Sequence, residues 1–176
     1  IQLVSLLLLG RIVGPEAFGL IGILTIFIAI AQIFVDSGFS NALIRKEDCT
    51  DSDYSTVFFF NIAIAIVSYL LLFYLAPLIA SFYNQPILSN LTKVLGLSIL
   101  INALCIIQRV LLTKSMDFKT QSKSSFISAI ISTVLAIWAA LKGLEVWALV
   151  IQTTVASLCN CILLNYFVRW RPTTFF

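Results

Sequence analysis

The sequence predicts an all-α integral membrane protein, a bundle of six transmembrane helices. Hydrophobic residues make up 60% of the chain, and only 11% of its residues are charged. Soluble domains carry roughly 25% charged residues, so this composition is typical of a protein that lies in lipid. The apolar residues also occur in long runs, and about 20 apolar residues in a helix cross a hydrocarbon core of roughly 30 Å. The short polar segments between the runs leave little chain for a soluble domain.

The apolar runs and the residues that interrupt them predict where each helix lies. The chain begins with Ile1 and its first run is about half a span long, so we expect a fragment whose first helix lacks its N-terminal turns. Gly and Pro residues mark the next turn, and Pro77 is expected to end or kink the third helix. The polar runs 45–55, 81–89 and 113–124 are expected to be loops. The six helices are therefore predicted at about residues 1–10, 16–44, 56–77, 90–112, 125–142 and 147–168.

The second helix carries a stripe of small and polar residues opposite a bulky face. Spacings of three and four residues define the stripe, which consists of Gly19, Gly22, Thr25, Ala29, Gln32, Asp36 and Ser40. The bulky face is expected to meet lipid and includes Leu20, Ile23, Phe27 and Phe34. The stripe is expected to face protein or a water-filled cavity, because a carboxylate in hydrocarbon costs several kcal/mol. Its small residues suit the close approach of another helix, whereas Gln32 and Asp36 are candidates for function.

Similar stripes mark three later helices. The third helix has Asn61, Ala65 and Ser68 on one face, and the fourth has Ser98, Asn102, Cys105 and Arg109. The fifth has a pattern of small residues that is expected where helices pack closely in lipid: Ser125, Ser128, Ser132, Ala136, Ala139 and Gly143. The polar members Asn61, Asn102 and Arg109 are further candidates for lining a substrate cavity.

The basic residues predict how the bundle is oriented. Eight follow the even-numbered helices: Arg45, Lys46, Arg109, Lys114, Lys119, Lys123, Arg169 and Arg171. Three belong to the opposite side: Arg11, Lys93 and Lys142. Because segments rich in Lys and Arg stay in the cytoplasm, the even-numbered helices are expected to end there, and both termini to be cytoplasmic.

Several kinds of chemistry are not expected. The chain has no histidine, which is the usual general base and metal ligand. Its four cysteines show neither the spacing of a metal site nor a disulfide framework. We therefore expect no enzyme active site, no bound metal and no cofactor, and no nucleic acid as a partner.

Six short motifs follow one another along the chain. They are LGRIVGPEAFGL at 9–20, FVDSGFSNALIRK at 34–46, TDSDYSTVF at 50–58, APLIA at 76–80, LLTKSMDF at 111–118 and WRP at 170–172. In this order they resemble the landmarks of the Wzx-type lipopolysaccharide and capsule flippases, a branch of the multidrug, oligosaccharidyl-lipid and polysaccharide exporter superfamily. The resemblance covers essentially the whole chain. Within this branch, the chain is similar to colanic-acid-type and teichuronic-type members.

The resemblance implies an architecture and a function. The full protein would have two six- or seven-helix lobes around a central cavity, with this chain as the N-terminal lobe. It would move a polyprenyl-pyrophosphate-linked oligosaccharide across the bacterial cytoplasmic (inner) membrane for O-antigen, capsule or exopolysaccharide biosynthesis. Its partners would be that lipid, the membrane lipids, the C-terminal lobe and the polysaccharide polymerase machinery. The resemblance transfers no site residues.

Two other functions stay open. A multidrug or cation antiporter of the related efflux branch would use similar helices, with Asp36 binding H⁺ or Na⁺. A membrane enzyme of envelope synthesis, such as a polymerase or glycosyltransferase, would carry a larger loop outside the membrane than any expected here.

For a flippase, our hypothesis is that Asp36 and Arg109 both face the central cavity near its cytoplasmic mouth. They belong to helices that run in the same direction, and their predicted depths differ by only about 4–5 Å, within reach of an Arg side chain. Arg109 would attract the pyrophosphate group, and Asp36 would restrain Arg109 or take up a proton.

Single cysteines introduced into a cysteine-free background test the predicted orientation. Cysteines that replace Ser52, Lys119 or Thr173 should resist impermeant thiol reagents added to intact cells, because these positions are expected in the cytoplasm. Cysteines that replace Glu16 or Gln85 should react. Labelling in the opposite pattern would contradict the orientation.

Overall fold

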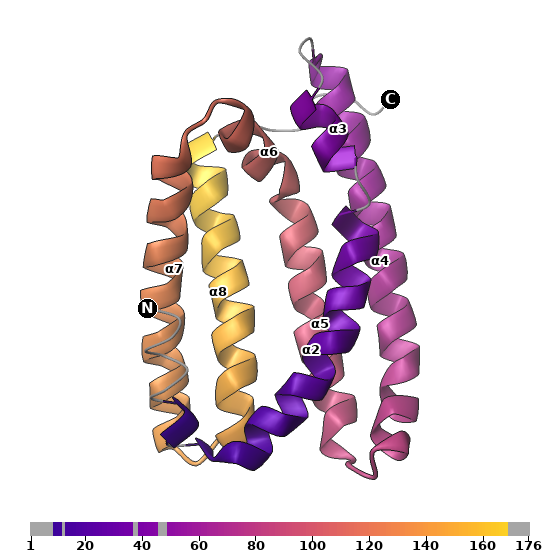
Figure 1. Ribbon diagram of the computed structural model, residues 1–176, viewed down its shortest axis with the longest axis vertical. Helices are drawn as coiled ribbons and strands as arrows, with labels where there is room; N and C mark the ends of the chain where they lie inside the picture. Colours follow the sequence, from indigo (N-terminus) through magenta and orange to yellow (C-terminus); the bar gives the residue numbers. More distant parts are fainter. Residues whose placement is uncertain (1–8, 12, 37–38, 46–48, 169–176) are drawn as a thin grey trace.

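The computed structural model describes residues 9–11, 13–36, 39–45 and 49–168, and nearly all of them are helical (Figure 1). Five helices within these ranges are long and apolar enough to span a membrane: α2 (Pro15–Asp36), α4 (Asp51–Phe82), α5 (Ile87–Leu104), α7 (Phe118–Leu141) and α8 (Glu145–Val168). Two are short: α3 (Phe39–Arg45) and α6 (Ile106–Lys114). The predicted all-α membrane fold is confirmed. Most of the first predicted helix, at 1–10, lies outside the described residues.

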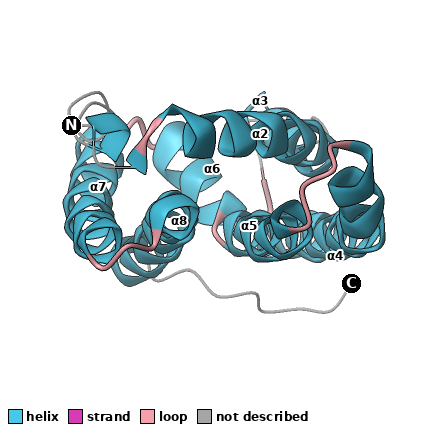
Figure 2. Cartoon of the chain, turned by 90° about the horizontal axis from the view of Figure 1, so that it is seen from below, coloured by secondary structure: helices cyan, strands magenta, loops and turns pink. Residues whose placement is uncertain are grey.

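The long helices form two antiparallel pairs that meet through α5 and α8. Helix α7 packs along α8, α4 packs along α5, and α5 packs against α8. Helix α2 crosses the front of the bundle in Figure 1 and contacts α4, α5 and α8. Figure 2 shows α7, α8, α5 and α4 along one side of the bundle and α2 along the other. Helices α2, α5 and α8 therefore end at the upper end of Figure 1, where α4 and α7 begin.

Helix α4 begins earlier than predicted, because a capping box starts it inside the expected loop at 45–55. The Thr50 N–H donates to Asp53 Oδ2 (2.9 Å), and the Asp53 N–H donates to Thr50 Oγ1 (3.3 Å). This reciprocal pair satisfies backbone donors that have no partner at a helix start. Tyr54 and Ser55 follow in the first turns of the helix, and both are buried.

Helix α7 also begins earlier than predicted, inside the expected loop at 113–124. Asp117 caps it, since its carboxylate accepts hydrogen bonds from the Thr120 N–H (3.1 Å) and the Thr120 hydroxyl (2.7 Å). These bonds lower the pKa of the Asp117 carboxyl below its ordinary value, because they stabilise the charged form. The charge also favours the positive end of the helix dipole.

Pro77 does not end the third predicted helix, since α4 continues through it to Phe82. Proline is tolerated inside membrane helices when the surrounding protein compensates for the missing backbone hydrogen bond. Here Ile79 and Ala80 are buried against α5. Two residues after the helix ends, Asn84 adopts a left-handed conformation (φ +52°). The next N–H, from Gln85, then donates to the Ala80 carbonyl (3.0 Å).

Within the predicted helix 16–44 the structure describes α2 and α3, and residues 37–38 between them lie outside the described residues. The predicted helix 90–112 was wrong as a continuous element. It is divided into α5 and α6 at Cys105 (φ −110°, ψ 14°), although no Gly or Pro is adjacent. Cys105 is fully buried against α8, so tertiary packing supports this break.

The face of small residues predicted on the fifth helix is confirmed as a packing face of α7. Ser128, Ser132, Ala136 and Ala139 are each at most 2% exposed, and the two alanines pack against residues of α8. Small side chains allow helices to approach closely, which supplies van der Waals contact where lipid provides no hydrophobic drive.

The bulky face predicted on α2 is only partly exposed: Phe34 is 65% exposed, but other bulky side chains of this helix are buried. Its buried residues include Leu24 and Val35, and Phe27 packs against the core instead of facing lipid. Around Gly19 and Gly22, no described atom lies within 4 Å of where a Cβ would be. The stripe of small and polar residues on α2 therefore points away from the other described helices. Periodicity revealed the two faces, but it could not tell which of them meets this bundle.

Replacing Ala136 by Leu tests the α7–α8 contact. The larger side chain has no space at this position, which is 0% exposed and packed in a cluster with residues of α8, so we expect a loss of about 1–3 kcal/mol in stability and less folded protein in the membrane. Ile131→Leu is the matched control, because Ile131 is 40% exposed. Equal losses in both variants, measured by fluorescence-detected size-exclusion chromatography, would argue against this packing face.

A second test concerns Met116, which ends α6 in the left-handed conformation (φ +54°) and is 78% exposed. Gly143 occupies the same position after α7 with φ +81°. A side chain at this conformation costs roughly 1 kcal/mol, so Met116→Gly should raise the thermal unfolding temperature and Gly143→Met should lower it. A lower temperature for Met116→Gly would show that the exposed side chain contributes more than its backbone costs.

Candidate functional site

The main polar cavity lies between the α5–α6 segment, α7 and α8, and has a volume of about 400 Å³. We call it the α5–α8 cavity. Its lining residues come from residues 125–133 of α7, from residues 152–160 of α8 and from both sides of the helix break at Cys105. They are Asn102, Arg109, Ser125, Ser128, Ala129, Ser132, Thr133, Gln152, Thr153, Ala156, Ser157 and Asn160. All but the two alanines have polar side chains, which is unusual at membrane depth.

Arg109 carries the only charge among the residues that line the cavity. Its guanidinium donates a hydrogen bond to Asn102 Oδ1 (3.3 Å). Asn102 belongs to α5 and Arg109 to α6, so this contact spans the helix break. The guanidinium has five N–H donors, and this bond occupies one of them. The cavity is therefore an electropositive, donor-bearing site without a carboxylate in its lining.

The α7 and α8 walls of the cavity present hydrogen-bond acceptors. The hydroxyls of Ser128 and Ser132 donate to carbonyls of their own helix, Ser124 (2.8 Å) and Ala129 (3.1 Å). The Thr153 hydroxyl likewise donates to the Leu149 and Val150 carbonyls. Because each hydroxyl proton is committed to the backbone, the oxygen lone pairs remain for a ligand or water. The buried Oδ1 of Asn160 also has no hydrogen-bond partner.

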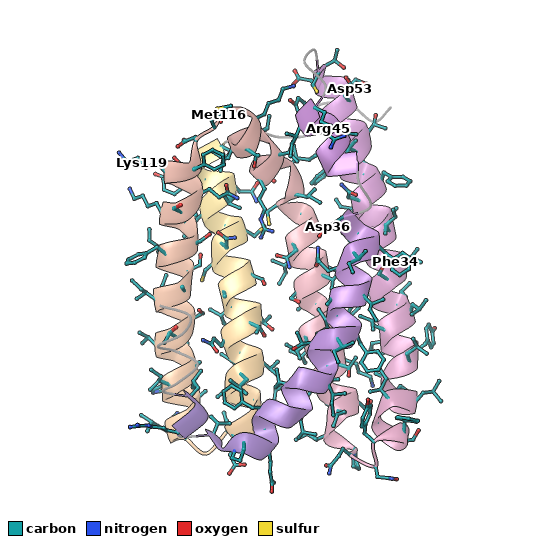
Figure 3. All side chains as sticks on the ribbon, viewed as in Figure 1. Phe34, Asp36, Arg45, Asp53, Met116 and Lys119 are labelled. Carbon is teal, nitrogen blue, oxygen red and sulfur yellow. The ribbon has the colours of Figure 1, made fainter. Side chains whose placement is uncertain are left out.

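Asp36 and Gln32 form a separate pair on α2. The Gln32 amide donates to Asp36 Oδ1 (3.2 Å), and Asp36 is exposed near the upper end of the helix (Figure 3). Neither residue lines the α5–α8 cavity. Within the described ranges, no ion pair joins Asp36 to Arg109. The hypothesis that these two residues restrain each other is therefore not supported by this structure.

Asn61 lies in the interior of the bundle, not on the cavity. It is fully buried on α4, and neither its Oδ1 nor its Nδ2 has a hydrogen-bond partner. Of the five predicted site residues, the structure thus brings only Asn102 and Arg109 together in one site, leaves Gln32 and Asp36 as a second pair, and isolates Asn61.

Sequence reasoning missed the contribution of α8. Gln152, Thr153, Ser157 and Asn160 all line the cavity. The signal was present, since Thr153, Ser157 and Asn160 follow one another at spacings of four and three residues on one side of the sixth predicted helix. These residues carry no charge and lie among many apolar neighbours, so they did not stand out in the sequence. Only the three-dimensional packing shows that this face of α8 borders the same cavity as Arg109.

Comparison with known proteins assigns the chain to a family. Residues 8–176 match the family described as polysaccharide biosynthesis protein. The teichuronic acid biosynthesis protein TuaB of Bacillus subtilis is 32% identical over 75% of this chain and 27% of its own length. The succinoglycan biosynthesis transport protein ExoT of Rhizobium meliloti is 27% identical over 98% of the chain and 35% of its own length.

A third relative is the lipopolysaccharide biosynthesis protein WzxC of Escherichia coli, which is 28% identical over 97% of the chain and 35% of its own length. The chain thus spans about a third or less of the length of these curated relatives. No solved structure matches it significantly. The family match covers nearly the whole chain. The chain therefore belongs to the polysaccharide biosynthesis protein family, and its relatives there include the Wzx-type protein WzxC.

Proposed function

We propose that this chain is the N-terminal lobe of a transporter that moves a polyprenyl-diphosphate-linked oligosaccharide across the bacterial cytoplasmic membrane. Two relatives support this function by their names, since ExoT is a succinoglycan biosynthesis transport protein and WzxC a lipopolysaccharide biosynthesis protein. The observation that carries the proposal is the α5–α8 cavity, a polar site with a single positive charge inside an apolar bundle. A charged side chain at membrane depth is costly, and such residues usually serve substrate paths.

The chemistry of the cavity fits the head group of such a lipid. The Arg109 guanidinium suits a diphosphate, since arginine binds phosphate through charge-assisted and often bidentate hydrogen bonds. The serine and threonine oxygens suit the hydroxyl groups of a sugar, because they face the cavity as acceptors. A volume of about 400 Å³ is near the lower limit for small-molecule sites. We therefore expect the site to hold the diphosphate and the adjoining sugar, with the remaining sugars outside it.

The position of the cavity suits loading from the cytoplasmic leaflet. Its α7 and α8 residues lie around the middle of those helices, whereas Asn102 and Arg109 come from the upper part of the α5–α6 segment. The cavity therefore extends from the middle of the bundle toward its upper end in Figure 1. The same end carries Arg45 and Lys119 (Figure 3), and also Lys114 and Lys123. By the charge rule for membrane proteins this end is cytoplasmic, where lipid-linked precursors are assembled.

The cavity gives no support to a cation antiporter. Such a protein needs a carboxylate that binds H⁺ or Na⁺, and the residues that line the cavity include none. Asp36 lies on the exposed stripe of α2 instead. We propose that this stripe, with Gln32 and Asp36, faces the passage between this lobe and the C-terminal lobe. We also propose that the protein acts without enzymatic chemistry.

Substitution of Arg109 in the full-length protein tests the proposed function. Arg109→Ala should reduce export of the host's surface polysaccharide by about tenfold or more, which corresponds to the loss of one charge-assisted hydrogen bond. Arg109→Lys should retain part of the export because the charge remains. Lys119→Ala is the control, since Lys119 is exposed at the same end outside the cavity.

Export is compared only between variants that reach the membrane in equal amounts. Normal export by Arg109→Ala under that condition would remove the cavity from the transport path. Because Asp36 and Arg109 do not touch, the exchange of the two charges, Asp36→Arg with Arg109→Asp, should not restore export.

A further inference from the structure

Asn61 is a fully buried amide without a hydrogen-bond partner. Its side chain is 0% exposed, and both Oδ1 and Nδ2 are unpaired. Leaving one buried polar group unpaired costs about 1–3 kcal/mol, so two such atoms on one side chain are a substantial penalty in this conformation. An apolar residue here would avoid this penalty. The packing of this conformation therefore gives no reason for an amide at this position.

The position of Asn61 on α4 places it beside the helix break at Cys105. One turn away, Ala65 is buried in a cluster with Ala103 of α5. In the other direction along α4, Tyr54 is buried in a cluster with Ile106 and Ile107 of α6. Since α4 runs antiparallel to α5 and α6, these two clusters imply that Asn61 lies at about the level of the interruption, between Ala103 and Ile106.

The break is held without a helix-breaking residue. The Cys105 thiol lies within hydrogen-bond reach of the Ile101 and Asn102 carbonyls (3.5 and 3.4 Å). The amide of Gln108 lies 3.2 and 3.3 Å from the Leu104 and Cys105 carbonyls and 2.7 Å from the Asn165 amide on α8. Backbone groups contribute as well, since the Cys105 N–H donates to the Asn102 carbonyl (3.2 Å) and the Arg109 N–H donates to the Cys105 carbonyl (3.2 Å). The break is thus held in part by side chains. A helix interrupted in this way can change its geometry by exchanging hydrogen bonds, because no proline ring restricts its backbone at the break.

The break also connects to the proposed binding site. The hydrogen bond from Arg109 to Asn102 spans it on the side of the cavity. A diphosphate that takes the Arg109 donors would compete with this bond and so loosen one of the contacts that fix the break. Cavity occupancy and the geometry of the break are therefore linked through the same guanidinium.

Resting on the proposed function, we propose that Asn61 is a positioning residue of the transport cycle. In a second conformation its amide pairs with backbone groups at the break, at Leu104 and Cys105, when these leave the partners that they have here. Asn61 thereby stabilises the rearranged form of the α5–α6 segment and lowers the stability of the present form. The unpaired amide raises the free energy of the present conformation, and this shifts the equilibrium toward the rearranged conformation.

Asn61→Leu in the full-length protein tests this role, because leucine has a similar branched shape but no polar atoms. The present conformation should become more stable, so the thermal unfolding temperature should rise by a few degrees. Export should fall about tenfold or more, because the second conformation has lost its amide partner. A purely structural residue would move both readouts in the same direction. Asn61→Ala serves the same test if the leucine variant does not reach the membrane.

Ser55→Ala is the matched control. Ser55 is also buried on α4 with an unpaired hydroxyl, but it lies six residues nearer the start of the helix than Asn61, next to Tyr54, which packs on α6. This variant should raise the unfolding temperature and leave export unchanged.

The thiols of Cys105 and Cys161 report on the break directly, because both are buried in one cluster that joins the break to α8. With Cys49 and Cys159 replaced by serine, copper phenanthroline should oxidise the pair to a disulfide at least about twofold faster in Asn61→Leu than in the parent protein, since the present conformation is more populated. Ser55→Ala should not change this rate.

A lower unfolding temperature for both Asn61 variants, or normal export by Asn61→Leu, would overturn the proposal. The unfolding and oxidation measurements need no substrate. If export instead proves insensitive to Arg109, the proposed function fails while these two measurements still decide whether Asn61 controls the break.

Discussion

The structure depends on one constraint: a polar group within hydrocarbon must find its hydrogen-bond partner inside the protein. Most of the hydroxyls meet it locally. Thr25, Thr92 and Ser128 donate to the backbone carbonyl four residues earlier in their own helix, at 2.7, 2.6 and 2.8 Å. A helix can therefore carry several hydroxyls at membrane depth without a partner helix to satisfy them. The same bonds leave oxygen lone pairs on the helix surface, from which a polar cavity can be built.

The α7–α8 contact shows how small residues serve packing and site formation together. Toward the lower end of Figure 1, Ala136 and Ala139 pack against Ala148 and Leu149, and the helices enclose apolar contacts. Toward the upper end, serines, threonines and amides replace the alanines, and the same pair of helices borders the α5–α8 cavity. One continuous stripe of small residues thus divides into a packing half and a binding half. The division coincides with the approach of Arg109 from α6.

The helix break at Cys105 decides what the cavity contains. Without it, Asn102 and Arg109 would be two turns apart on one straight helix. With it, the guanidinium reaches back to the Asn102 amide at 3.3 Å, and both groups border the cavity. The break lacks Pro and Gly, so local propensity does not produce it. Burial of Cys105 and Ile107 against neighbouring helices and the Gln108–Asn165 hydrogen bond support it instead.

The sequence by itself determined the class of protein, the approximate position of each long helix and the packing face of α7. These features follow from the length and period of the apolar runs, which are local properties of the chain. The motifs in order along the chain also indicated the family. The N-caps of α4 and α7, in contrast, lie in the polar segments 45–55 and 113–124, which were predicted as loops.

Only the tertiary structure decided which face of each helix meets which neighbour. It turned the stripe of α2 away from the described bundle, placed Asn61 in an apolar interior and separated Asp36 from Arg109. It also recruited Gln152 and Asn160 of α8 to the cavity. The physical reason is that periodicity fixes faces relative to a helix's own axis, whereas rotation about that axis, helix breaks and partner choice depend on contacts between residues distant in the chain.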